Sequence, residues 1–120
     1  MNEPNPQTVT VFGLRNCDTC RKALRWLEGE GVEHHFHDLR ADGLERARVG
    51  RWLASPQADR LVNRRSTTWR SLDESRRAAQ GDALLDLLLE HPTLIKRPVF
   101  ERRGEVLAVG FDPDRLRGTL

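Results

Sequence analysis

The first forty residues carry the pattern that most limits how this chain can fold. Residues 8–13, TVTVFG, alternate β-branched and aromatic side chains and stop at a glycine, which predicts a β-strand. From Asp18 the apolar side chains recur at helical spacing, and Gly31 predicts the end of that helix. Residues 32–40, VEHHFHDLR, predict a second strand. A strand, a helix and a strand in this order predict a βαβ unit, whose two strands lie parallel in one sheet.

The rest of the chain predicts a helical segment and then a hairpin. The helical segment covers about residues 42–91, and its last helix begins at Asp82 and ends before a proline. Residues 93–111 predict two strands joined by a turn at Arg103-Gly104, and Asp112-Pro113 predicts the start of a final short helix. Two pairs resemble capping boxes that start helices in the middle of the chain, namely Asp42 with Glu45 and Ser71 with Glu74.

This order predicts an α/β protein with a mixed four-stranded sheet, built as βαβ and then ββα around a helical insertion at about residues 42–91. The only two cysteines, Cys17 and Cys20, follow the first strand directly. The combination is typical of the thioredoxin-like, or glutaredoxin-like, fold. At 120 residues we expect one domain, with residues 1–7 as a loose N-terminal tail.

The position of the cysteine pair predicts unequal roles for the two thiols. Cys17 lies where the loop meets the helix, and the first turn of a helix has unpaired N–H groups and a partial positive charge. A thiolate is stabilised there, so the pKa of Cys17 is expected to fall. Cys20 lies one turn further along, close enough to attack a mixed disulfide on Cys17. We therefore predict Cys17 as the nucleophile and Cys20 as the resolving thiol.

Two other interpretations of the pair remain open. A structural zinc ion requires four ligands, and the second pair would come from His34, His35 and His37, which alternate between the two faces of a strand. The two cysteines can also be buried and chemically inert. In the cytoplasm a close cysteine pair is more often catalytic, redox-sensing or metal-binding than a structural disulfide. Because the histidines are divided between two faces, we favour redox chemistry without a metal.

Basic side chains elsewhere predict an anion site beside the cysteines. Arg97-Pro98 precedes the third strand, where a thioredoxin-like layout places a cis proline beside the nucleophile, so Arg97 is expected near Cys17. Arg64 and Arg65 lie in the middle loop, and guanidinium groups bind oxyanions and carboxylates well. Which of the two faces the site is open. The predicted catalytic residues are thus Cys17, Cys20 and Arg97, and the predicted substrate-binding residues are Arg64, Arg65, Asn16 and Pro98.

The charge balance and the apolar content restrict the partners. Twenty basic and eighteen acidic residues leave a net charge of +2, which argues against direct binding of nucleic acid. No apolar run approaches the length of a membrane span, and the first ten residues have no signal-peptide features. We therefore expect a cytoplasmic protein with no membrane association. Because no exposed apolar stripe is obvious, we expect a monomer.

Three blocks of sequence carry a resemblance to a known family. They are VFGLRNCDTCRKALRWLEGEGVEHHFHDLR at residues 11–40, LVNRRSTTWRSL at residues 61–72 and HPTLIKRPVFERRGEVLAVGF at residues 91–111. In this order they resemble the ArsC (glutaredoxin-linked arsenate reductase) family, and most of all its Spx/YffB-like branch, over about residues 8–117. The resemblance implies a thioredoxin-like fold and thiol chemistry in the cytoplasm.

The resemblance also implies roles for single residues. Cys17 matches the nucleophile of the family, Arg97 matches an arginine that contacts the oxyanion in arsenate reductases, and a further arginine of those enzymes falls near residues 63–65. Two departures weaken the arsenate assignment. A third arginine of the reductases has no counterpart near Gly110, where VGF instead resembles the YffB-like branch, thought to be glutathione-dependent thiol reductases. Cys20 is absent from many members, whereas Spx regulators often use such a pair as a redox switch.

Three functions are consistent with these residues. The first is a thiol oxidoreductase in which Cys17 attacks an oxidised thiol or a glutathione mixed disulfide, with glutathione as co-substrate and glutathione or glutaredoxin as partner. The first alternative is the reduction of arsenate, a small oxyanion, to arsenite with glutathione and glutaredoxin. The second alternative is an Spx-like redox-sensing regulator that binds RNA polymerase.

Overall fold

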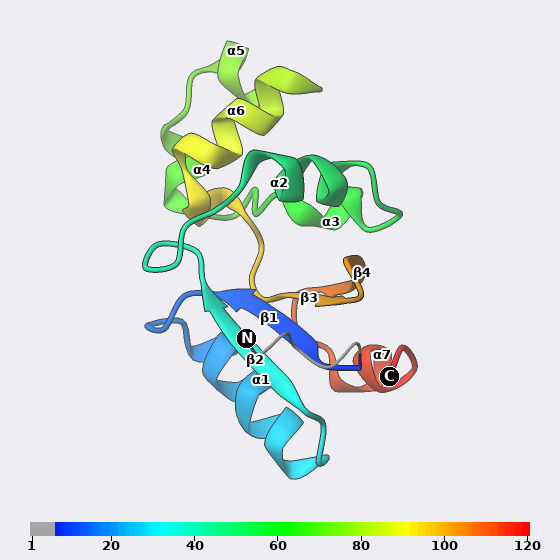
Figure 1. Cartoon of the computed structure of the whole chain (residues 1–120). Helices are drawn as coiled ribbons and strands as arrows, with labels where there is room; N and C mark the ends of the chain where they lie inside the picture. The colour runs from blue at the N-terminus through cyan, green and yellow to red at the C-terminus, as the bar shows by residue number, and fades with distance from the viewer. Residues whose placement is uncertain (1–6) are drawn as a thin grey trace. The chain divides into compact units, whose positions relative to one another are not determined.

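A computed structural model of the chain describes residues 7–120, which form two compact units (Figure 1). The first unit joins the chain up to Asp42 with Arg97–Leu120, and the second is Gly43–Lys96. The single domain over residues 1–120 stays a prediction. Of the predicted tail at residues 1–7, all but Gln7 lies outside the described residues.

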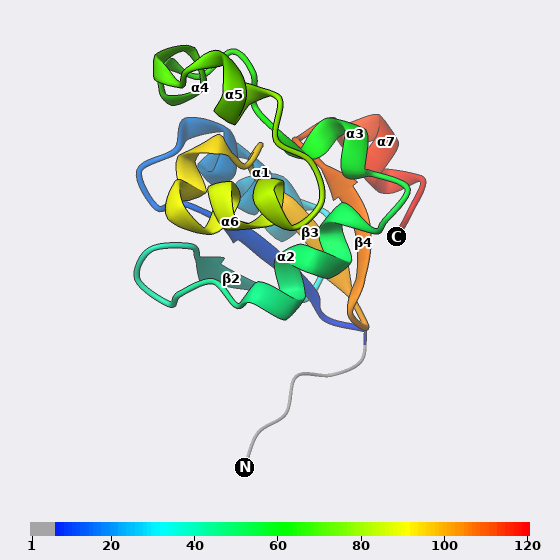
Figure 2. The same cartoon turned by 90° about the horizontal axis from the view of Figure 1, so that it is seen from above.

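The first unit contains the predicted four-stranded mixed sheet. Its strands lie in the order β2-β1-β3-β4 (Figure 2). β1 and β2 are parallel, as a βαβ unit requires, while β3 is antiparallel to both of its neighbours. In chain order the elements of this unit are β1 (Val9–Gly13), α1 (Asp18–Gly29), β2 (His34–Asp38), β3 (Val99–Arg102), β4 (Glu105–Val109) and α7 (Pro113–Arg117).

Helix α1 begins directly after the first cysteine and ends at a glycine motif. Cys17 still has an extended backbone, with φ −100° and ψ 120°, so the helix begins at Asp18. At the other end Gly31 has a φ of +69°, and the N–H of Val32 donates to the carbonyl of Leu27 at 3.0 Å, which closes a Schellman motif. The buried side of the helix contains Cys20, Ala23 and Leu27.

A hydrophobic core lies between one face of the sheet and the helices α1 and α7 (Figure 1). The two helices therefore cover the same face of the sheet. Burying a side chain of the size of Phe or Leu contributes about 1.5–3 kcal/mol, so this packing stabilises the sheet together with both helices. The fully buried members of the core are Val9, Val11, Ala23, Leu27, Phe100, Ala108 and Leu116.

The hairpin turn and the start of the last helix agree with the predictions. Arg103 and Gly104 join β3 to β4 with φ values of 57° and 77°, and the tight two-residue turns of hairpins favour positive φ at both positions. Before α7, Asp112 Oδ1 accepts the N–H groups of Asp114 and Arg115 at 3.2 and 3.4 Å. A proline occupies the first position of this helix.

The second unit is helical, as the pattern of the middle segment predicts. Helices α2 and α6 pack against each other (Figure 2). The unit ends at Lys96 rather than near residue 91, because a short 3₁₀ helix and a bridge between Val62 and Ile95 belong to it. Its elements are α2 (Arg46–Leu53), α3 (Ala58–Leu61), α4 (Thr67–Ser71), α5 (Glu74–Arg77), α6 (Asp82–Glu90) and η1 (Pro92–Leu94). Within the described residues, no helix is both long enough and apolar enough to cross a membrane.

Both predicted capping boxes in the middle of the chain are wrong. The N-cap of α2 is Glu45, and the side chain of Asp42 instead accepts the backbone N–H of Asp38 at 2.9 Å. Helix α5 is capped by Asp73, which accepts the N–H of Arg76 at 2.8 Å. The physical reason is that a short acidic side chain bonds to whichever backbone N–H group lies nearest, and that depends on the path of the loop.

Candidate functional site

Cys17 lies where the loop after β1 enters the first turn of α1. Its backbone N–H donates to the carbonyl of Leu14 at 3.1 Å, and its own carbonyl accepts the N–H of Arg21 at 3.1 Å. The residue is half-buried. Its sulfur is therefore held at the N-terminus of a helix, where the unpaired N–H groups of the first turn favour a negative charge.

Donors from two segments surround the sulfur of Cys17. Partial burial disfavours its thiolate, but the backbone N–H and the thiol of Cys20 and the guanidinium of Arg97 hydrogen-bond to it. The positive charge of Arg97 acts in the same direction as these bonds. Together they outweigh burial and hold the pKa of Cys17 below its ordinary value. More of Cys17 is therefore nucleophilic thiolate near neutral pH than is the case for a free cysteine.

The second cysteine has the opposite character. Cys20 is only 1% exposed, and burial raises the pKa of Cys20 to about 12. A hydrogen bond with the backbone of Leu14 opposes this rise in the pKa, while the hydrogen bond to Cys17 and the negative charge of Cys17 contribute to it. Both cysteines are free thiols. One sulfur thus favours the thiolate while its neighbour keeps a proton, an asymmetry consistent with the predicted nucleophile and resolving thiol.

Arg97 reaches the site through the loop before β3. The Arg97–Pro98 peptide bond is cis, as a thioredoxin-like layout predicts. Pro98 is buried, and its carbonyl accepts the N–H of Gly110 at 2.8 Å, which ties the loop to the end of β4. Because β3 pairs antiparallel with β1, the residue before β3 lies at the end of the sheet from which β1 leads into Cys17. The sheet therefore brings Arg97 to Cys17, although the two residues are far apart in the sequence.

A buried carboxylate holds the loop before Cys17. Asp38, at the end of β2, is 5% exposed. Its Oδ1 accepts the N–H groups of Ala41 and Arg40 at 2.9 and 2.8 Å, and its Oδ2 accepts the N–H of Arg15 at 3.1 Å. The bond from Ala41, joined by those from Arg40 and Arg15, outweighs burial and holds the pKa of Asp38 below its ordinary value.

Reasoning from sequence missed Asp38. The available signal was an acidic residue at the end of a strand predicted to lie parallel to the strand that leads into the cysteines. Pairing in register places Asp38 opposite Gly13, within reach of the loop that carries Cys17.

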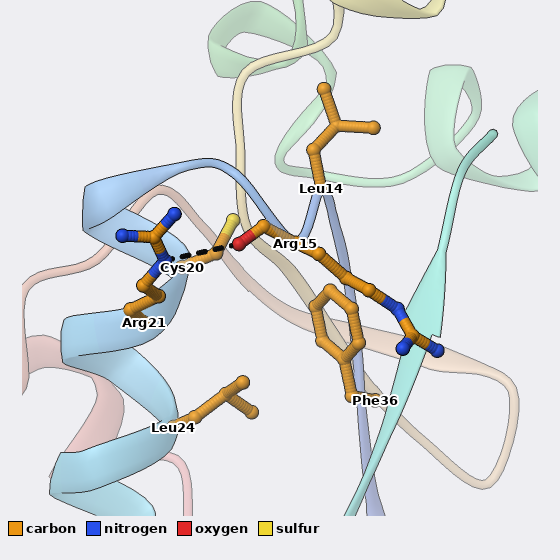
Figure 3. Close-up of a pocket in the computed structure, with 6 residues that line it drawn as sticks. All are labelled: Leu14, Arg15, Cys20, Arg21, Leu24 and Phe36. Carbon is orange, nitrogen blue, oxygen red and sulfur yellow. Dashed lines mark hydrogen bonds between the residues drawn. The ribbon is translucent and has the colours of Figure 1, made fainter. Parts of the chain in front are cut away.

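A hollow of about 320 Å³ lies beside the cysteine loop (Figure 3). Its walls come from this loop, α1 and β2, so it belongs to the first unit. Across it Nε of Arg21 donates to the carbonyl of Arg15 at 3.1 Å. Such a partly apolar, partly cationic lining is suited to a small anionic compound. The lining residues are Leu14, Arg15, Cys20, Arg21, Leu24 and Phe36.

The remaining predicted binding residues are divided between the two units. Asn16 is exposed in the loop directly before the nucleophile. In the second unit the guanidinium of exposed Arg64 lies over the ring of Trp69, 5.5 Å from its centroid. The backbone N–H of exposed Arg65 donates to Asn63 Oδ1 at 3.2 Å. The part of Arg64 and Arg65 in an anion site stays a prediction.

The three histidines of β2 have separate surroundings. His34 Nδ1 lies 2.9 Å from the carbonyl of Val32, and His35 is exposed. The ring of His37 packs against Phe12, with the ring centroids 4.8 Å apart. Among residues 7–120, no group of three His, Cys, Asp or Glu side chains is arranged to hold a metal ion.

A mixed sheet with a cysteine at the start of its first helix and a cis proline before its third strand defines the thioredoxin-like class of proteins. Comparison with known families narrows this class. The model of the ArsC family matches residues 12–119, and the chain belongs to this family. The family resemblance of the three sequence blocks is thereby confirmed.

Known proteins of similar structure and sequence agree with this assignment. The structure of the YFFB protein is 39% identical, with a TM-score of 0.83, over 93% of this chain and 98% of that one. An arsenate reductase (ArsC) related protein from Brucella melitensis is 38% identical, with a TM-score of 0.75, over 97% of both chains. The global transcriptional regulator Spx of Streptococcus pyogenes serotype M6 is 27% identical over 114 residues, which are 93% of this chain and 84% of that protein.

These likenesses confirm the thioredoxin-like fold and the Spx/YffB-like branch of the ArsC family. Membership of the ArsC family and the likeness to an arsenate reductase (ArsC) related structure support a protein of the thiol oxidoreductase or arsenate reductase kind. A transcriptional regulator is also among the relatives.

Proposed function

We propose that this chain is a glutathione-dependent thiol oxidoreductase with Cys17 as its nucleophile. The observation that carries the proposal is the set of donors around the Cys17 sulfur, which come from Cys20 and Arg97 and lower the pKa of Cys17. A thiolate, and not a thiol, attacks disulfides. The similarity to the YFFB protein and to an ArsC-related protein supports thiol chemistry at this position.

The first proposed step is a thiol–disulfide exchange. The Cys17 thiolate attacks the glutathione sulfur of a mixed disulfide between glutathione and the substrate. A disulfide forms between Cys17 and glutathione while the disulfide bond between glutathione and the substrate breaks. The substrate leaves as a thiolate and takes a proton from water, so it is reduced as Cys17 is oxidised.

The second step regenerates Cys17 by one of two routes. A second glutathione thiolate attacks the glutathione sulfur, which frees Cys17 and releases glutathione disulfide. Alternatively, Cys20 attacks the sulfur of Cys17, which releases glutathione and leaves a Cys17–Cys20 disulfide for two further glutathione molecules to reduce. The hydrogen bond and the charge of the Cys17 thiolate both raise the pKa of Cys20, and both are lost once Cys17 is in a disulfide. Cys20 therefore becomes easier to deprotonate at the step that requires its thiolate.

The proposal is tested with protein in which Cys20 is replaced, so that an adduct on Cys17 cannot be resolved internally. Cys20→Ser protein is incubated with glutathione disulfide and its mass is measured. We expect one glutathione adduct, and none on the matched Cys17→Ser/Cys20→Ser control. If no adduct forms although Cys17 titrates as a low-pKa thiol, glutathione is not the partner. If ultraviolet titration places the pKa of Cys17 at or above about 8.5, the value of a free thiol, a catalytic role for Cys17 is ruled out.

Arsenate reduction is the second candidate, and the position of Arg97 favours it. A guanidinium that donates to the nucleophile can also neutralise an oxyanion that the nucleophile attacks. Cys17 would form a bond to arsenic(V) with loss of water. A glutathione thiolate would then attack the Cys17 sulfur, so that a mixed disulfide forms and arsenite leaves. Turnover with arsenate, glutathione and glutaredoxin that depends on Cys17 would support this candidate, and turnover unchanged in Cys17→Ser would eliminate it.

The similarity to Spx supports a third candidate, a regulator that binds RNA polymerase. The observation in its favour is the adjacent pair of free thiols, which a disulfide can link. Capture of RNA polymerase by the tagged full chain, compared between the reduced and oxidised protein, tests this candidate. An absence of binding in both states would rule it out.

A further inference from the structure

Gly13, the last residue of β1, lies against the sulfur of Cys20. A Cβ atom built on Gly13 would be 2.4 Å from Cys20 Sγ, a separation that non-bonded carbon and sulfur atoms do not adopt. The other neighbours of this Cβ would be at ordinary contact distance, since Cys20 Cβ and Phe36 Cε1 both lie at 3.4 Å. The cysteine sulfur thus occupies the space that any side chain at position 13 would need.

The backbone at this position does not itself require glycine. Positive φ angles occur at Gly31, Gly43, Gly81, Gly104 and Gly110, and Gly13 is not among them. It continues the strand, lies opposite Asp38 in the parallel pair and accepts the N–H of Leu39 at 2.9 Å. All L-amino acids can adopt an extended strand conformation. Gly13 therefore differs from those glycines: glycine is required here because a side chain has no space, and not because of the backbone conformation.

Cys20 in turn provides two of the donors to the Cys17 sulfur, its backbone N–H and its thiol. The thiol is nearly inaccessible to solvent, and the raised pKa of Cys20 keeps the proton that it donates. A hydrogen bond weakens steeply when its donor moves off line. A side chain at position 13 would push the Cys20 sulfur about 1 Å from its place to reach an ordinary contact distance.

We propose that Gly13 is a positioning residue for the cysteine pair: it makes room for the Cys20 thiol behind Cys17, so that this thiol donates to the Cys17 thiolate. In this scheme Gly13 takes no part in the reaction and acts on Cys17 only through the Cys20 sulfur that it contacts. The proposal extends the proposed function, but it concerns the reactivity of Cys17 itself and holds for whichever electrophile Cys17 attacks.

The test is a double-mutant cycle between positions 13 and 20, read out as the alkylation rate of Cys17 by iodoacetamide across a pH series. Below the pKa of Cys17 this rate follows the thiolate fraction. Gly13→Ala is expected to slow alkylation about tenfold, the order of one hydrogen bond to a charged group, and to move the pH profile upward. In a Cys20→Ala background the sulfur is absent, so Gly13→Ala is expected to change the rate less than twofold.

A matched control and a measurement of folding keep the result unambiguous. Gly29→Ala lies at the end of α1 with open space around its Cβ position, and it is expected to leave the pH profile unchanged. Equal slowing by Gly13→Ala with and without Cys20, or no slowing at all, would overturn the proposal.

If Gly13→Ala does not fold, as judged by circular dichroism, the double variant Gly13→Ala/Cys20→Ala decides. Its recovery supports the contact with the Cys20 sulfur, and its failure to fold overturns the proposal. The cycle requires no glutathione. A normal cycle with no glutathione adduct would therefore refute the proposed function and leave the role of Gly13 intact.

Discussion

The two units of the chain hold their charged and reactive side chains in different ways. In the first unit the site is assembled from distant segments, since Cys17 follows β1, Asp38 ends β2 and Arg97 precedes β3. In the second unit Arg64 and Arg65 are exposed on a loop, in which Ser66 Oγ accepts the N–H of Trp69. Removing a long-range contact is therefore expected to cost more in the first unit than removing a surface contact costs in the second.

The largest effect on stability is expected from the core behind the site. Phe100→Ala removes a fully buried ring between the sheet and α1, and it should lower the free energy of unfolding by about 3–5 kcal/mol. Urea denaturation measures this change. The control Phe100→Leu keeps most of the apolar volume and should cost clearly less. A loss below about 1 kcal/mol for Phe100→Ala would contradict the packing described for this unit.

The next largest effect is expected at Asp38. Asp38→Asn keeps the shape but cannot accept all three backbone N–H groups, so it should lower the free energy of unfolding at neutral pH by about 1–3 kcal/mol. The folded protein holds the pKa of Asp38 below the unfolded value of about 3.9. The carboxylate therefore stabilises fully above that pH, and its contribution is lost as the pH falls through the lower, folded value.

Urea denaturation of both proteins at a series of pH values checks this prediction. The difference between wild type and Asp38→Asn should narrow below about pH 4. Asp18→Asn is the control, because Asp18 makes an exposed ion pair with Arg21 and should show a small difference throughout. A difference for Asp38→Asn that stays constant into strong acid would exclude the role assigned to its carboxylate.

The next effect is expected at Arg97, and it concerns the reactivity of Cys17 rather than the stability of the fold. Arg97→Ala removes a hydrogen bond and a positive charge beside the sulfur, and alkylation of Cys17 below its pKa should slow about tenfold. Arg97→Lys keeps the charge without the planar guanidinium and should recover part of the rate. Arg25→Ala, at an exposed position of α1, is the control. If the pH profile of alkylation is the same in Arg97→Ala as in the wild type, Arg97 does not lower the pKa of Cys17.

The smallest effect is expected in the second unit. Arg76 Nη2 lies 2.6 Å from Glu90 Oε2, and both side chains are well exposed, at 39% and 56%. Arg76→Ala should change the free energy of unfolding by about 0.2–1 kcal/mol, less at high salt, and leave the alkylation of Cys17 unchanged. Urea denaturation at two salt concentrations, combined with the alkylation assay, measures both. A change as large as that of Asp38→Asn would show that surface contacts of this unit matter as much as the buried ones of the first.

The elements of both units were largely predictable, because their signals are local. Gly31 closes the end of helix α1, the hairpin turns at Arg103-Gly104 and Asp112 caps the last helix, and each depends on residues within a few positions. The two predicted capping boxes were wrong, although each matched the expected residue types and spacing. Several acidic and hydroxyl side chains lie near each helix start, and the sequence does not say which of them meets a free N–H group.

The sequence predicted which two segments form the site, but not how their atoms are arranged. The sequence by itself determined the cysteine pair at a helix start, the arginine before a proline ahead of the third strand and the family to which the chain belongs. These features are spacings of a few residues, and they can be recognised in the sequence without knowledge of the fold.

Only the tertiary structure decided that Asp38 holds the loop, that the Cys20 sulfur fills the space beside Gly13, and that this thiol and Arg97 both donate to Cys17. These are distances between atoms on different strands, loops and helices. They follow from strand register and from packing within the first unit, and the physical reason is that contacts of a few ångströms between distant segments leave no periodic signal in a single chain.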